Sequence, residues 1–79
     1  MEKEYKTSDL ALAAVISLWV SIDRLEKVDT RKVNFVFPNT EQLQKIVDGF
    51  WKKKLQVEPQ DYFAAMKQLK NMIFDSERR

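Results

Sequence analysis

The clearest strand signal in this chain of 79 residues is the stretch Val33-Asn34-Phe35-Val36-Phe37. Its alternation puts Val33 and both phenylalanines on one face of a strand. Residues 20–27 are also β-like in composition, and the polar residues 27–31 between the two runs favour a turn. The pattern therefore predicts a β-hairpin formed by residues 20–27 and 32–37.

A helix is predicted before the hairpin, because residues 10–16 are rich in helix formers. Thr7 or Ser8 supplies a hydroxyl that can accept an unpaired backbone N–H where this helix begins, and Asp9 complements the helix dipole. Apolar residues cover most of its circumference, so we expect it to be buried on more than one side. We also expect a short edge strand around Tyr5.

Two further helices are predicted after the hairpin. Asn39 and Gln42 have the spacing of a capping box, with Asn39 in the place of the usual Ser or Thr. The helix that follows has one apolar face, formed by Leu43, Ile46, Val47 and Phe50. Pro59 suits the first position of a third helix that ends near Phe74. The apolar stripe of that helix is formed by Tyr62, Phe63, Met66, Leu69 and Ile73.

These elements predict a single α+β domain over residues 1–79, in the order helix, β-hairpin, helix, helix, with the short edge strand in front. Packing three helices against one face of the hairpin is the simplest closed arrangement. We expect an ordered core over residues 5–74 and solvated tails at 1–4 and 75–79.

Composition excludes several classes of protein. The chain has no cysteine and no histidine, so it can form no disulfide, and we expect no metal site. The longest apolar stretch, residues 10–18, is too short to span a bilayer, and no signal peptide is visible, so we expect a cytoplasmic protein. A net charge of +2 permits nucleic-acid binding without arguing for it.

Four segments of the chain resemble a known family. They are residues 5–14, 35–41, 47–51 and 62–70, and together they are similar to small bacterial and phage-encoded proteins known only as a domain of unknown function. The resemblance implies a prokaryotic or phage setting. It implies no activity, ligand or site residue.

A basic cluster is the first candidate site. Trp51, Lys52, Lys53 and Lys54 place an aromatic ring beside cations, with Lys45 earlier on the predicted helix and Arg31 in support from the hairpin. Such a surface can hold a phosphate backbone while the indole stacks on a base. The alternative is a solvated helix end, with Trp51 packed against Tyr62 or Phe63.

Apolar helix surface is the second candidate site. Leu12, Val15, Ile16 and Trp19 form one stripe of the first helix, which either faces the chain's own core or forms a dimer interface. The third helix carries Phe63, Met66, Met72 and Phe74, which serve either the core or a protein partner.

No catalytic pattern is visible. A serine or threonine nucleophile would lack its usual histidine, and phosphate-binding loops need glycines where this chain has only Gly49. Each of Asp9, Asp23, Glu26, Asp48 and Asp61 has a structural explanation at a helix start or beside a basic residue. We therefore expect no enzyme, no cofactor and no small-molecule substrate.

The sequence favours a non-enzymatic interaction module that binds a protein partner or a second copy of itself. The alternative is a small nucleic-acid-binding protein that uses residues 51–54. The two hypotheses differ in their expected response to salt, which weakens phosphate contacts steeply.

Overall fold

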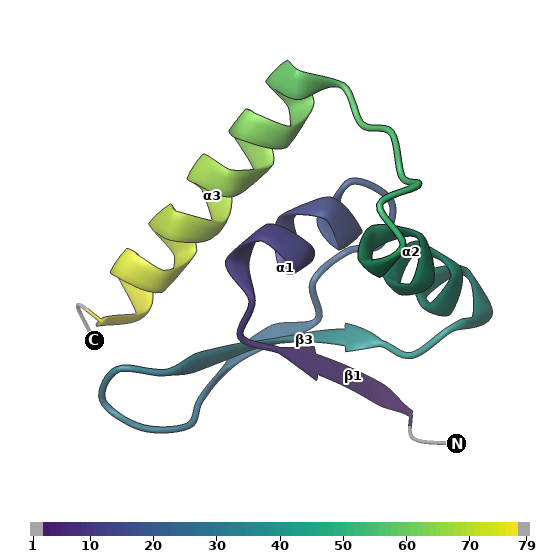
Figure 1. Cartoon of the computed structure of the whole chain (residues 1–79). Coiled ribbons are helices and arrows are strands. Elements are labelled where there is room, and N and C mark those ends of the chain that lie inside the picture. Colours follow the sequence, from purple (N-terminus) through teal and green to yellow (C-terminus); the bar gives the residue numbers. More distant parts are fainter. Residues whose placement is uncertain (1–2, 78–79) are drawn as a thin grey trace.

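The computed structural model describes residues 3–77 (Figure 1), so parts of both predicted tails, 1–2 and 78–79, lie outside the described residues. The elements follow the order β1 (Glu4–Thr7), α1 (Leu10–Ser17), β2 (Arg24–Lys27), β3 (Val33–Pro38), α2 (Glu41–Trp51) and α3 (Pro59–Glu77). The predicted α+β class and the layout of strand, helix, hairpin, helix and helix are confirmed.

The strands form one antiparallel sheet in the order β1-β3-β2. The predicted edge strand is β1, in which Tyr5 lies opposite Phe37, while Leu25 of β2 lies opposite Phe35. The central strand is therefore the one with the strongest alternating pattern.

The predicted start of β2 at residue 20 is wrong, because β2 begins at Arg24. The N–H of Val20 donates to the carbonyl of Ile16 in the turn that ends α1, and the Val20 side chain is buried in the core. Val20 is therefore apolar because its side chain packs in the core, and not because it belongs to a strand.

Two predicted helix caps are corrected. Asp9 itself caps α1, since its Oδ1 accepts the N–H of Leu12 at 3.1 Å, whereas the hydroxyl of Thr7 accepts the N–H of Asp9. Thr40, and not Asn39, caps α2 through the N–H of Leu43 at 3.1 Å. In each case the capping side-chain oxygen belongs to a residue closer to the helix than predicted, from which it reaches the N–H of the first turn with standard geometry.

The third helix begins at Pro59, as predicted, and runs to Glu77, past its predicted end near Phe74. Its first turn is closed by Glu58, whose carboxylate accepts the N–H of Asp61 at 3.0 Å. Two boundaries predicted for the tails are also corrected, because Glu4 belongs to β1 and residues 75–77 belong to α3.

The three helices lie on one side of the sheet, with α1 between α2 and α3 (Figure 1). All five residues from Leu12 to Ile16 are buried, which confirms that α1 is covered on more than one side. α1 packs on the sheet, and α2 and α3 lie on either side of α1. The three helices therefore do not cover the hairpin face equally, as the simplest predicted arrangement had them. The core contains Leu12, Ile16, Phe35, Phe37, Leu43 and Leu69.

Candidate functional site

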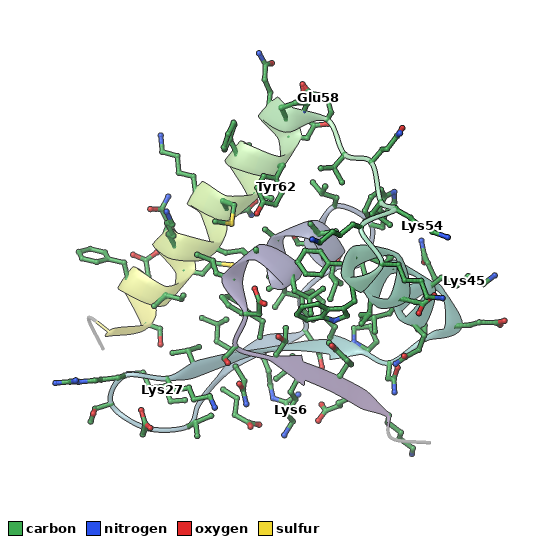
Figure 2. All side chains as sticks on the ribbon, in the orientation of Figure 1. Lys6, Lys27, Lys45, Lys54, Glu58 and Tyr62 are labelled. Carbon is green, nitrogen blue, oxygen red and sulfur yellow. The ribbon has the colours of Figure 1, made fainter. Side chains whose placement is uncertain are left out.

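The predicted basic cluster lies at the C-terminal end of α2. Lys45 and Lys52 are two helical turns apart on the same side of the helix, and Lys53 and Lys54 follow in the turn after it. All four are exposed, and Lys45 and Lys54 project at the α2 end of the molecule (Figure 2). Lys52 forms an ion pair with Asp48, with 3.1 Å between Nζ and Oδ2. Among residues 3–76, whose side chains the structure describes, no carboxylate pairs with the other three lysines.

The cluster takes its shape from a tight turn. The N–H of Lys53 donates to the carbonyl of Phe50 at 3.1 Å, and the N–H of Lys54 donates to Gly49 at 3.0 Å. This bond pattern is a Schellman motif, whose left-handed position is usually glycine. Here that position is Lys53, with a φ of 59°. A Cβ on Gly49 would lie 2.8 Å from Cδ1 of Leu55, so the absent side chain leaves room for the returning loop.

Trp51 is 61% exposed beside these lysines. It meets the ring of Phe50 edge-on, with 5.0 Å between the ring centroids. Among the described residues the ring contact of Trp51 is with Phe50, so the packing of Trp51 against Tyr62 or Phe63 is not found, whereas the exposure of the helix end agrees with the solvated alternative. Trp51 thus presents an accessible flat surface next to cations.

Arg31 does not join this surface. It belongs to the loop between β2 and β3, and this loop lies at the opposite end of the molecule from α2 (Figure 1). Asp29 organises that loop, because its Oδ1 accepts the N–H groups of Arg31 and Lys32 at 2.7 and 2.8 Å. The support that we predicted from Arg31 is therefore corrected.

The predicted interface on α1 is mostly buried within the chain. Leu12, Val15 and Ile16 are 1%, 5% and 0% exposed, because α2, α3 and the sheet enclose them. Only Trp19, just beyond the helix end, is accessible at 47%. The stripe therefore serves the core of the chain, which was the alternative to a dimer interface.

α3 carries an exposed surface that the sequence pattern did not isolate. Phe63 and Phe74 are 68% and 57% exposed, so the predicted place of Phe63 in the apolar stripe is wrong. Lys67 and Lys70 are exposed between them, and the spacing i, i+4, i+7, i+11 puts all four on one helical face. We call these four residues the α3 outer stripe. Met66 and Met72 instead pack against the core.

The sheet face away from the helices is charged. Lys6 and Arg24 lie on either side of Val36, and Figure 2 shows Lys6 below the sheet. Lys6 reaches across to Glu26 with 3.1 Å between Nζ and Oε2, and Arg24 reaches in the opposite sense to Glu4 with 3.2 Å between Nη2 and Oε1. These crossing pairs cover Val36, which is fully buried on an otherwise open face.

The crossing pairs also shift proton affinities. The hydrogen bond from Arg24 lowers the pKa of the Glu4 carboxyl, and the same bond raises the pKa of Arg24. Both groups reach solvent, so the pairs organise a surface and do not form a buried catalytic centre.

The remaining features offer little for catalysis. A groove of about 450 Å³ between the end of α1 and α3 is lined partly by Ser17 and Gln68, but the Ser17 hydroxyl already donates to the carbonyl of Ala14 at 2.7 Å. In the described part of the chain, no three Asp or Glu side chains are placed to hold a metal ion. Over the same residues, no helix has the length and apolar character to cross a membrane.

One family model matches residues 2–75 of the chain, and it is described as a domain of unknown function, DUF5659. The chain belongs to the DUF5659 family. The match confirms the similarity to a family of unknown function that the four sequence segments indicated. No curated protein and no solved structure matches the chain. The DUF5659 description names no activity, so the function has to be argued from the surfaces above.

Proposed function

We propose that this DUF5659 chain is a non-enzymatic interaction module that binds another protein through the α3 outer stripe. The observation that carries the proposal is the exposure of Phe63 and Phe74 on one face of a long helix. Aromatic side chains are enriched among the residues that dominate protein interfaces, because they bury a large area with few rotatable bonds. The cytoplasmic location and the bacterial or phage setting stay predictions.

The position of α3 supports this use. One side of the helix packs on α1 through Ala65 and Leu69, both buried, and the other side faces away from the rest of the molecule (Figure 1). Phe63 and Phe74 are therefore not needed to complete the core. Replacing them should leave the fold intact, since exposed substitutions usually change stability by about 0.5 kcal/mol or less.

The test selects binders from a displayed library of random helical peptides on the wild-type chain. We expect the selected peptides to lose at least about tenfold in affinity for the Phe63→Ser/Phe74→Ser variant, because interface anchors typically contribute 1 kcal/mol or more each. Trp51→Ser is the matched control, since it removes an equally exposed aromatic ring from α2. Unchanged binding to the α3 variant would overturn the proposal, and so would loss of binding to the control alone.

Self-association through the same stripe is tested by sedimentation equilibrium over a range of concentrations. A dimer that dissociates in the Phe63→Ser/Phe74→Ser variant would make the partner a second copy. A monomer at all concentrations would leave the partner to be a different protein.

A second function, binding of nucleic acid, is favoured by one specific observation. Trp51 is exposed beside Lys53 and Lys54, and neither lysine is neutralised by a carboxylate of the described residues. Cations next to an aromatic ring suit a phosphate backbone with a stacked base.

This second function is tested by tryptophan fluorescence. Trp19→Phe removes the other indole, so that the signal reports on Trp51 alone. Titration with duplex DNA, single-stranded DNA and RNA at about 50 and 200 mM salt should give quenching that is lost at the higher salt. No quenching at the lower salt would overturn this second function.

A further inference from the structure

We infer that the α3 outer stripe fits an acidic partner, namely a protein groove that is apolar at both ends and carries carboxylates between them. This inference rests on the proposed function and names the chemistry of the partner. It follows from the spacing, the charge and the symmetry of the stripe.

The spacing fixes the shape of the partner. Phe63 and Phe74 are separated by three helical turns, which places them about 16 Å apart along the axis of α3. Anchors on one face of a protruding helix are typical of helix-in-groove recognition. Two apolar pockets at that separation would receive the two rings.

The charge fixes the chemistry between the pockets. Lys67 and Lys70 lie between the rings, and neither forms an ion pair with a described carboxylate. Asp61 and Asp75 lie off the stripe, about 160° and 120° around the helix from Phe63, and Glu77 follows Phe74 in the sequence, so no acid of α3 stands between the two rings on this face. The stripe is thus locally basic although the whole chain is nearly neutral, and complementary charge on a partner sets orientation and specificity.

Symmetry argues against a second copy of the chain as the occupant. An antiparallel pair of stripes would bring Phe63 to Phe74 of the other copy, and Lys67 to its Lys70. A parallel pair would bring each lysine to its own equivalent. Both arrangements oppose like charges at the centre of the contact, which is unfavourable.

The stripe fits nucleic acid less well than a protein groove. Single-stranded nucleic acid is held by aromatic rings that stack on successive bases. Two rings about 16 Å apart, with Lys67 and Lys70 between them, leave the intervening bases without a ring. The same geometry suits two separate apolar pockets.

The test uses three synthetic peptides, each of two helices joined by a turn, that differ only in charge. The groove between the two helices carries leucines at both ends, spaced like Phe63 and Phe74, and between them either glutamates, glutamines or lysines. Binding is followed by backbone amide shifts in the NMR spectrum of the isotope-labelled chain. We expect the glutamate peptide to bind about fivefold more tightly than the glutamine peptide, equivalent to about 1 kcal/mol.

Variants of the chain make the result specific. Lys67→Glu/Lys70→Glu should reverse the preference, so that the lysine peptide binds best. Lys52→Glu/Lys54→Glu changes the net charge by the same amount at α2, and the preference for glutamate should persist. If either variant behaves otherwise, the inference of an acidic partner is overturned.

The outcomes separate this inference from the proposed function. Equal binding of the glutamate and glutamine peptides, abolished by Phe63→Ser/Phe74→Ser, would overturn the acidic groove and support the protein-binding function. Absence of binding by all three peptides would overturn both. Shifts at α3 caused by single-stranded DNA or anionic phospholipid vesicles, and larger than those caused by the glutamate peptide, would assign the stripe to that other class and overturn the inference.

Discussion

Replacing Lys53 with glycine should make the protein more stable, although the change removes a side chain. Lys53 holds the left-handed position of the turn after α2, with a φ of 59°. A residue with a Cβ in this conformation is strained by about 1–2 kcal/mol, and glycine is not. Glycine loses more chain entropy on folding, which costs about 0.5–1 kcal/mol. The net gain for Lys53→Gly is therefore about 0.5–1 kcal/mol.

The assay is urea unfolding followed by far-UV circular dichroism, with thermal unfolding as a second measure. For a domain of this size, about 1 kcal/mol raises Tm by about 4–8 °C. Lys53→Ala is the matched control, because it removes the same charge at the same position but keeps the Cβ that is strained at this φ. We expect that control to gain no stability. If Lys53→Gly were no more stable than Lys53→Ala, the strain assigned to this turn would be refuted.

Three further predictions concern other parts of the fold. Arg24 lowers the pKa of the Glu4 carboxyl, so the pair stabilises the fold above the ordinary carboxyl pKa, and this stabilisation is lost as pH falls through the lowered pKa. The urea midpoints of wild type and Glu4→Gln should therefore differ at neutral pH and converge as the pH falls into the acid range; a constant gap would contradict this. Gly49→Ala should stabilise the Leu55→Ala variant by about 1 kcal/mol, because alanine favours a helix over glycine. In the wild-type chain the gain should be clearly smaller, because the new methyl group would meet the Leu55 side chain. A double-mutant cycle measured by urea unfolding compares the two gains. Thr40→Ala should cost about 1 kcal/mol and Thr40→Ser much less in the same assay, and equal losses would exclude the hydroxyl as the helix cap.

Most of the fold could be predicted because local signals agreed with one another. The alternation around Phe35 marks the central strand, and Pro59 marks the start of α3. The start of β2 could not be predicted, since a buried Val20 in a turn has the same composition as a strand residue. Asn39 and Thr40 are both good helix caps, and which one caps α2 depends on the backbone path after β3 ends at Pro38. Residue propensities do not specify that path.

The candidate sites were less predictable, because they depend on how elements are placed in space. Lys52–Lys54 are neighbours in the sequence, so their clustering was visible, whereas the separation of Arg31 follows from the length and direction of the hairpin. The sequence names Phe63 and Phe74 as residues for the core or for a protein partner, but it groups them with Met66 and Met72 and not with Lys67 and Lys70. Phe63 was grouped with the core positions around Met66, and only the packing of α3 on α1 shows which side of the helix is covered.

The crossing pairs above Val36 connect two strands that share no backbone hydrogen bond. β1 and β2 are both edges, each joined to β3 alone, yet Lys6 and Arg24 tie them together through their side chains. An edge strand that frays must therefore break contacts with the opposite edge. Opening at one margin of the sheet is weakly coupled in this way to the other, so removing Lys6 or Arg24 should modestly raise amide exchange at both edges and not at one edge alone.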